Sequence, residues 1–224
     1  MFIINFKNYN EISGTNASKL AKIAEKISKK YEIKIALVPP QHFLSEFARY
    51  SIPVLAQHVD TAGIGSTTGF IVPEIIKKSK VSGSLLNHSE HRISEKEITE
   101  LVPRLKKLDM ISVVCVKDVD EVKKYAKLNP DYIAIEPPEL IGTGKAVSKE
   151  KPEIITKSVI AVKQAGNSTK LLCGAGIVSG EDVTKAIQLG AKGILVASGI
   201  VKAKNWNSII EEFASAISKT QRRL

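Results

Sequence analysis

Cysteine is scarce in this chain, and the two cysteines present form no recognisable motif. Cys115 and Cys173 each lie in a short apolar run, without CxxC spacing and without a nearby histidine pair. Zinc sites and redox dithiols need such spacing, so neither a metal nor a redox centre is expected. Two isolated thiols suit a reducing compartment better than a secreted disulfide scaffold, although the sequence is compatible with one disulfide.

Long apolar runs are also missing. No stretch of roughly 18 uncharged apolar residues occurs, so no segment is expected to cross a bilayer. The apolar run that starts at Phe2 follows Met1 directly, without the basic region and small-residue cleavage site of a signal peptide. We therefore expect a cytoplasmic protein with no membrane partner.

Lysine and arginine outnumber aspartate and glutamate, which gives the chain a net charge of +10. Most lysines alternate with acids along helical segments, as in residues 94–97 and 120–124, which is typical of solvated helix faces. Only residues 219–223 form an unrelieved basic cluster, and no aromatic residues alternate with it for base stacking. The sequence therefore predicts no nucleic-acid partner.

Short apolar runs alternate with amphipathic stretches along the whole chain of 224 residues. The predicted strands are residues 2–6, 33–38, 54–57, 84–87, 112–116, 132–136, 170–173 and 193–197. The predicted helices are residues 17–30, 43–50, 73–78, 98–107, 119–127, 154–164, 183–189 and 209–217.

Eight such repeats favour an α/β fold of the (β/α)8-barrel type, with eight parallel strands inside a ring of helices. We expect one domain over residues 1–224, because single barrels commonly have this length. A doubly wound open sheet is the alternative. No Gly-x-Gly-x-x-Gly follows the first strand, as a dinucleotide-binding sheet would normally require.

Polar residues follow three of the predicted strands. The first strand ends at Asn5-Phe6-Lys7, the fourth at His88-Ser89-Glu90, and the sixth at Glu136. Taken singly, each has a structural explanation, such as a surface charge, a hydrogen-bonded histidine or a loop cap. In a barrel, however, all carboxyl ends of the strands meet at one rim, where catalytic groups stand.

Glycine-rich loops follow the sixth, seventh and eighth strands. They contain Gly142 and Gly144, Gly174 and Gly176, and Ala197-Ser198-Gly199. Tight turns alone would explain such glycines. Small residues also let backbone N–H groups approach an anion, and barrels often bind phosphate after strands seven and eight. The combination with Lys7 favours a phosphate monoester.

These sequence motifs resemble those of the triosephosphate isomerase family and occur in the same order, at the corresponding strands. The resemblance covers essentially the whole chain. The motif strings are Asn5-Phe6-Lys7, residues 88–92 and residues 136–145. The short chain and Cys173-Gly174-Ala175-Gly176-Ile177 look most like the compact archaeal branch. The resemblance implies a TIM barrel that interconverts dihydroxyacetone phosphate and D-glyceraldehyde 3-phosphate without a cofactor or a metal.

Residue by residue, the resemblance implies roles for three catalytic groups. Glu136 matches the base, His88 the neutral electrophile, and Lys7 the cation that holds substrate charge. Further matches are Asn5 as a substrate contact, Glu90 as a supporting acid, and Gly142, Gly176, Ala197 and Ser198 as phosphate-binding positions. Residues 137–145 match a closing lid, but Pro138-Glu139 and Cys173 replace the residues found in many members.

Two other functions stay open at this stage: a different phosphosugar enzyme of the barrel class, and a non-catalytic anion-binding protein. Assembly is a further expectation. The connection 58–72 is the longest loop, and its tip contains Thr67 and Thr68. In the resembled family this loop inserts beside the first and fourth strands of a second subunit. We therefore expect a homodimer or a homotetramer.

Overall fold

The computed structural model describes residues 1–222 of the protein. Arg223, which belongs to the predicted basic cluster, and Leu224 lie outside the described residues. One sheet contains eight strands, and every pairing between neighbours is parallel. The strands are β1 (Phe2–Asn5), β2 (Ile35–Val38), β3 (Leu55–Ala56), β4 (Gly83–Leu86), β5 (Ile111–Val116), β6 (Tyr132–Ile135), β7 (Lys170–Cys173) and β8 (Ile194–Val196).

The sheet curves round until its two edge strands meet. The strand order is β2-β1-β8-β7-β6-β5-β4-β3. A parallel bridge between Leu37 and Val54 joins the ends, and the Leu37 N–H donates to the Pro53 carbonyl at 2.9 Å. The predicted (β/α)8 barrel is therefore confirmed, and the open doubly wound sheet is excluded.

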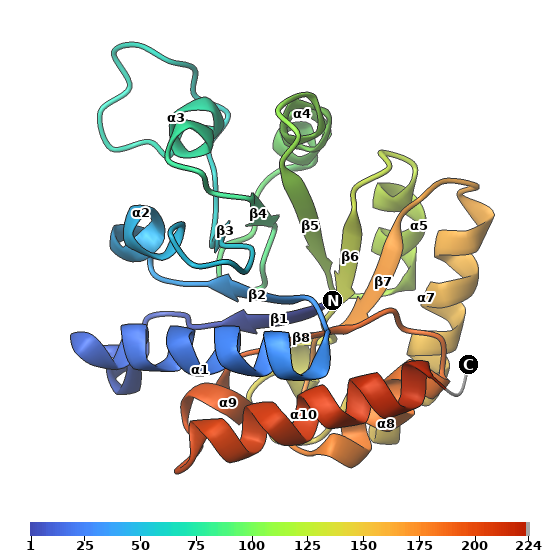
Figure 1. The fold of residues 1–224 in the computed structure, drawn as a ribbon. Coiled ribbons are helices and arrows are strands. Elements are labelled where there is room, and N and C mark those ends of the chain that lie inside the picture. The colour runs from blue at the N-terminus through green and yellow to red at the C-terminus, as the bar shows by residue number, and fades with distance from the viewer. Residues whose placement is uncertain (223–224) are drawn as a thin grey trace.

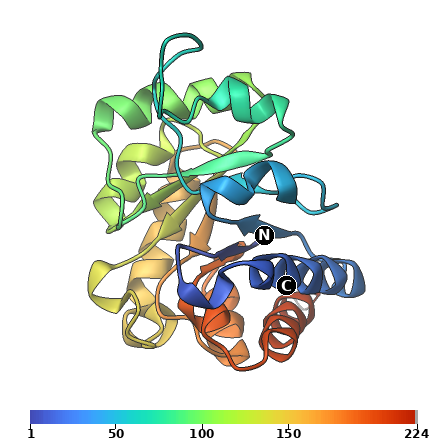
Figure 2. The ribbon, with the colours of Figure 1, turned by 90° about the vertical axis from the view of Figure 1, so that its left-hand side faces the viewer.

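Helices surround the barrel on its outside (Figure 1, Figure 2). They are α1 (Thr15–Tyr31), α2 (Leu44–Phe47), α3 (Pro73–Lys78), α4 (Glu95–Lys107), α5 (Val119–Ala126), α6 (Val147–Glu150), α7 (Pro152–Gln164), α8 (Gly180–Gln188), α9 (Ser198–Val201) and α10 (Trp206–Gln221). Short 3-10 helices are η1 (Asn10–Ile12), η2 (Gln41–Phe43) and η3 (Pro138–Leu140). The expectation of eight helices is wrong for residues 1–222, because α6 and α9 are additional.

Helix starts are set by local sequence. Ser94 and Glu97 form a reciprocal capping box that begins α4, and Ser179 and Asp182 do the same for α8. Pro152 stands at the first position of α7, where its missing N–H costs nothing. These caps satisfy backbone N–H groups that would otherwise lack partners, and they fix the loops that approach the barrel rim.

Apolar side chains pack on both faces of the sheet. One cluster fills the barrel interior and includes Ile3, Leu85 and Leu172. The other lies between the strands and the helices, where Phe2 packs against Phe213 of α10 with ring centroids 6.0 Å apart. Strands buried on both faces are typical of parallel sheets. The filled interior makes the barrel a rigid support for the loops at its ends.

The two cysteines are free and lie on opposite faces of the sheet. Cys115 belongs to the barrel interior and Cys173 to the layer under the helices. Burial raises the pKa of both thiols, which therefore stay protonated. Across residues 1–222, no helix combines the length and the apolar character that a membrane span requires.

Closure between β8 and β1 gives the first prediction. A Cβ at Gly193 would lie 1.8 Å from the Met1 carbonyl oxygen, which accepts a hydrogen bond from Ile194 at 3.1 Å. We expect Gly193→Ala to lower the free energy of unfolding by about 2 kcal/mol or more, because backbone would have to move. Denaturant unfolding measures this change. Gly63→Ala is the control, since nothing lies within 4 Å of its Cβ position. Equal stability of the two variants would contradict the prediction.

Candidate active site

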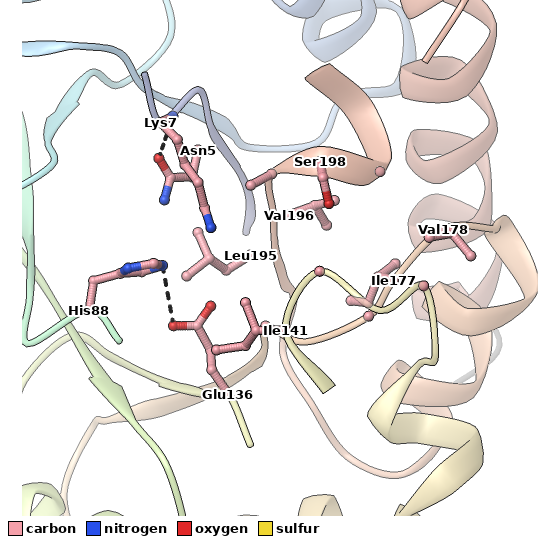
Figure 3. A pocket seen from close by; sticks show the side chains of 16 residues that line it. Asn5, Lys7, His88, Glu136, Ile141, Ile177, Val178, Leu195, Val196 and Ser198 are labelled. Atoms are coloured by element: carbon pink, nitrogen blue, oxygen red, sulfur yellow. Dashed lines mark hydrogen bonds and ion pairs between the residues drawn. The ribbon is translucent and has the colours of Figure 1, made fainter. Parts of the chain in front are cut away.

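One pocket at the carboxyl ends of the strands brings together residues from the ends of five strands, β1, β4, β6, β7 and β8, and from the loops that follow them (Figure 3). Its lining includes the predicted Asn5, Lys7, His88, Glu136, Gly142, Gly176, Ala197 and Ser198. It also includes Ile141, Gly144, Gly174, Ile177, Val178, Leu195, Val196 and Gly199. Glu90 lies in the adjoining cavity and reaches this pocket through its contact with Lys7.

Lys7 is held in one position by its own backbone and by two neighbours. Its φ of 48° lies in the left-handed region, which is unfavourable for a residue with a Cβ. The Asn5 side chain accepts a hydrogen bond from the Lys7 N–H at 3.0 Å and so supports this conformation. The Lys7 ammonium lies 2.6 Å from Glu90 Oε1, with its side chain only 12% exposed. A cation is thus fixed at the pocket.

His88 follows β4 and is fixed in one tautomer. The Glu90 backbone N–H donates to His88 Nδ1 at 3.2 Å, so the proton of the neutral ring lies on Nε2. Burial lowers the pKa of His88 to about 4, and the nearby Lys7 charge acts in the same direction. At neutral pH the ring is therefore uncharged and presents an N–H donor to the pocket.

Glu136 follows β6 and is almost completely buried, with 5% of its surface exposed. Its Oε2 lies 3.7 Å from His88 Nε2 and has no hydrogen-bond partner among residues 1–222. Burial raises the pKa of Glu136 to about 7, while a hydrogen bond from the Cys115 thiol and the Lys7 charge lower it. A carboxylate with this pKa can accept and return a proton near neutral pH.

The pKa values of His88 and Glu136 are thus shifted in opposite directions by one cause, the removal of water. A buried imidazole stays neutral, and a buried carboxyl group becomes a stronger base. Such pairs of perturbed groups in a cleft are typical of acid–base sites. The arrangement can remove a proton from a bound molecule while it donates a hydrogen bond to an oxygen of that molecule.

Gly174 provides the space that Glu136 occupies. A Cβ at this position would lie 2.5 Å from Glu136 Cγ and 3.0 Å from Oε1. Gly176 has a φ of +70°, and its Cβ would lie 1.8 Å from the Lys145 carbonyl oxygen. Both glycines are therefore required by close approach, one beside the carboxylate and one beneath the loop that covers it.

Backbone N–H groups line the opposite side of the pocket. Within residues 1–222, the N–H groups of Gly142, Gly176 and Ser198 have no hydrogen-bond acceptor. Ser198 and Gly199 begin α9, so their N–H groups lie at a positive helix end. Amides of this kind bind anions without a charged side chain. The pocket can therefore hold a phosphate group at these amides, in the same pocket as the Glu136 carboxylate.

The segment 137–145 crosses the pocket mouth. It begins with η3, turns at Gly142 and Gly144 with φ near +70°, and is closed by a hydrogen bond from Thr143 Oγ1 to the Leu140 carbonyl at 2.9 Å. Glu139, which differs from many members of the resembled family, forms an ion pair with Lys151 just before α7. This ion pair connects the start of the loop to the helix that follows it.

Three residues that shape the site were not predicted to act on Glu136 or on the His88 loop. The Cys115 thiol on the neighbouring strand lowers the pKa of Glu136, although the two residues are distant in the chain. Gly174 makes room for that carboxylate. Asn87, with φ of +60°, donates from Nδ2 to the Cys115 carbonyl at 3.0 Å and so fixes the start of the His88 loop. Only the glycine motif around Gly174 gave a signal in the sequence.

The fold and the pocket together define an α/β-barrel protein with an acid–base pair and an anion-binding side at the carboxyl rim. Comparison with known proteins narrows this class. A family model described as triosephosphate isomerase matches residues 1–213. The chain therefore belongs to the triosephosphate isomerase family.

Archaeal relatives named triosephosphate isomerase are similar over nearly their full length. The protein of Cenarchaeum symbiosum (strain A) is 55% identical over 97% of this chain and 98% of its own. That of Methanothermus fervidus is 46% identical over 95% of this chain and 96% of its own. That of Methanocaldococcus jannaschii is 45% identical over 97% of this chain and 100% of its own. The expected likeness to the compact archaeal branch is confirmed.

The raised pKa of Glu136 predicts a stability change with pH. Between about pH 4.5 and 7 the folded chain holds a proton that the unfolded chain has lost, so stability falls as pH rises. Glu136→Gln removes this effect. At pH 8 we expect the variant to be more stable than wild type by up to roughly 3 kcal/mol, a difference that vanishes towards pH 4.5.

Urea unfolding at matched protein concentration measures the difference. Glu139→Gln is the control, because its ion pair with Lys151 holds the pKa of Glu139 below its usual value. That substitution should slightly lower stability at pH 8, the opposite sign. A Glu136→Gln protein no more stable than wild type at pH 8 would show that the buried charge is not destabilising.

Proposed function

We propose that the chain catalyses the reversible interconversion of dihydroxyacetone phosphate and D-glyceraldehyde 3-phosphate. One observation carries the proposal: the unpartnered Glu136 Oε2 lies 3.7 Å from His88 Nε2, which bears the ring proton. The amide-lined side of the same pocket supplies a place for the phosphate. The archaeal relatives, which are named triosephosphate isomerase, agree with this activity.

Glu136 acts as the base in this proposal. It removes a proton from C1 of dihydroxyacetone phosphate, and the electron pair moves onto the carbonyl oxygen to give an enediolate. A proton then passes from the C1 hydroxyl to the C2 oxygen. The protonated Glu136 carboxyl group gives its proton to C2 as the C1 oxygen becomes a carbonyl, which leaves an aldehyde at C1 and a hydroxyl group at C2. No electrons enter or leave, so the residues need no redox partner. A pKa near 7 suits both the removal and the return of the proton.

His88 and Lys7 stabilise the negative charge that develops on the two oxygens. The neutral Nε2–H donates to each oxygen in turn, as described for this enzyme family, and its low pKa keeps the ring uncharged. The Lys7 ammonium adds electrostatic stabilisation, which is stronger where water is excluded. Residues 137–145 form the lid that excludes water and hinders loss of phosphate from the enediolate.

Two other functions are less well supported. A different phosphosugar enzyme of the barrel class would share the amide-lined pocket without needing Asn5, Lys7, His88 and Glu136 together. A non-catalytic binding protein would have no use for a buried, unpartnered carboxylate, which is costly. A coupled assay with dihydroxyacetone phosphate as substrate distinguishes all three functions.

The role of Glu136 is tested by Glu136→Gln, which keeps the shape and removes the base. We expect turnover to fall by at least about a hundredfold in the coupled assay, the lower range for loss of a general base. In wild type, kcat/KM should fall as the pH drops below about 7, because Glu136 becomes protonated. Glu139→Gln makes the same chemical change in the lid and should cost far less. Near-normal turnover of purified Glu136→Gln would remove this residue from the mechanism.

We further propose a homodimer, or a homotetramer of paired dimers, built on the loop of residues 58–72. Within the described part of the chain, three of the five exposed large apolar side chains lie on this loop or on α3, namely Ile64, Phe70 and Ile75. With Leu44 and Ile76 they line a groove of about 360 Å³. Such a patch on one side of a small protein supports an interface.

The loop is held by hydrogen bonds within the chain and projects from the barrel (Figure 1, Figure 2). The Arg104 guanidinium donates to the Thr61 and Ala62 carbonyls at 2.8 Å each and forms two bonds with Glu74. Asp60 accepts the Ile71 N–H at 2.6 Å, which joins the two ends of the loop. A preorganised loop loses little conformational freedom when it docks.

A receiving cavity lies beside the pocket. It has a volume of about 500 Å³ and is lined by Lys7, Tyr9, Gln57, Glu90 and other residues near the first and fourth strands. Insertion of Thr67 and Thr68 from a second subunit would cover Lys7 and Glu90 there. Assembly would therefore hold Lys7 in position for catalysis. Separately, we propose a cytoplasmic location, which the reaction on a triose phosphate supports.

Replacement of Thr67 and Thr68 by arginine tests the interface. The two bulky cations should block insertion beside Lys7, so both the mass measured by light scattering and the turnover should fall. Asn207→Arg with Ser208→Arg on α10 adds the same charge elsewhere and should change neither. A wild-type protein that is monomeric at assay concentration and yet fully active would contradict the proposal.

A further inference from the structure

A second concentration of charge lies at the opposite end of the barrel from the pocket. Five neighbouring strands, in the order β2-β1-β8-β7-β6, begin at this end. The residues at their starts include Lys34, Met1, Lys192, Lys170 and Tyr132. Three lysines thus stand on consecutive parts of one rim, although they are far apart in the sequence.

Backbone hydrogen bonds fix the spacing of this rim. The Phe2 N–H donates to the Lys34 carbonyl at 2.8 Å, and the Met1 amino group donates to the Lys192 carbonyl at 3.1 Å. The Lys192 N–H in turn donates to the Leu171 carbonyl at 2.7 Å, next to Lys170. The barrel therefore fixes the spacing of the three lysine backbones along this rim.

The side chains surround a cavity of about 370 Å³. Besides the three lysines, its lining includes Met1, Tyr132 and Gln221. This volume falls within the about 300–1,000 Å³ typical of small-molecule sites. The Tyr132 hydroxyl and the Gln221 amide add neutral hydrogen-bonding groups to the basic wall.

The positive charges in this cavity are poorly compensated. Lys34, Lys170 and Lys192 form no ion pair with any carboxylate in the described part of the chain. Glu32, at the end of α1, is the acid in the lining. Asp131, at the start of β6, is already bonded to the Ser112 N–H and hydroxyl. Burial and the charges of Lys170 and Lys34 lower the pKa of the Met1 amino group to about 6.

Helix ends do not account for these lysines. Lysines near the carboxyl end of a helix are often explained by the helix dipole. Here α1 already carries Lys29 and Lys30 in its last turn, whereas Lys34, Lys170 and Lys192 lie on or just before strands. Like charges held together destabilise the rim unless an anion lies between them.

We propose that this cavity is a second, non-catalytic site for a compact, multiply charged phosphate anion of the pyrophosphate type. The ammonium groups of Lys34, Lys170 and Lys192 contact its phosphoryl oxygens, and Tyr132 and Gln221 contribute hydrogen bonds. Binding relieves the repulsion between the lysines and stabilises the folded chain. The proposal does not rest on the isomerase activity, because no residue of this cavity lines the pocket around Glu136.

Calorimetric titration with pyrophosphate at low salt tests the proposal, with the catalytic pocket first saturated by 2-phosphoglycolate. We expect one site per chain. The triple variant Lys34→Gln, Lys170→Gln, Lys192→Gln should bind at least about tenfold more weakly, because each exposed ion pair contributes modestly. Arginine at the same three positions should retain binding. A control triple, Lys22→Gln, Lys26→Gln, Lys157→Gln, removes the same charge from scattered helix positions and should bind as wild type does.

Two further measurements make the result decisive. Isomerase activity should be equal in all of these proteins, which shows that they fold. Pyrophosphate should raise the melting temperature of wild type but not of the cluster variant, because only the native cluster binds it. Wild-type affinity in the cluster variant would overturn the proposal. Equally weakened pyrophosphate binding in the cluster variant and in the control triple would also overturn the proposal, since the overall charge of the protein would then explain the binding.

Discussion

The removal of water from one end of a closed parallel barrel is the constraint on which the rest of this molecule depends. All eight strands run in the same direction, so their carboxyl ends meet above an interior filled with side chains such as Leu195. Groups placed there are buried by the barrel below and by residues 137–145 above. Burial then sets the protonation of the two groups that face each other, and it makes His88 neutral and Glu136 basic.

The buried Glu136 carboxylate and the left-handed backbone of Lys7 both lower the stability of the fold. Neighbouring residues offset part of this loss. Glu136 is held beside a glycine, with one oxygen unpartnered, while Cys115 gives the carboxylate a weak hydrogen bond. Lys7 adopts a left-handed backbone and needs the Asn5 side chain to support it. Such strained or unsatisfied groups are found where function requires them, and a well-packed barrel can tolerate them.

The sequence predicted the elements whose signal is local. β7 has the predicted bounds, and α3 does as well, because an apolar run or an initial proline marks each start. β3 shortens to two residues, and α6 and α9 were missed, because four-residue helices are too short to show a period. The predicted site residues other than Glu90 line one pocket because the parallel topology brings the carboxyl ends of the strands together. The sequence could not predict that Cys115 and Gly174 lie beside Glu136, because these neighbours depend on packing between distant segments.

The anchoring of the loop 58–72 by Arg104 has a consequence for how the molecule evolves. One guanidinium holds the two carbonyls of Thr61 and Ala62 and the carboxylate of Glu74, so the shape of the loop is set from its base. The tip, residues 65–69, forms its own turn, in which the Thr67 hydroxyl donates to the Gly63 carbonyl at 3.0 Å and Gly65 and Gly69 have positive φ. A substitution at Thr68 therefore leaves the base intact, whereas loss of Arg104 removes the contacts that hold the projecting form. Selection for a matching partner surface can act on a few residues that the folding of the barrel does not need.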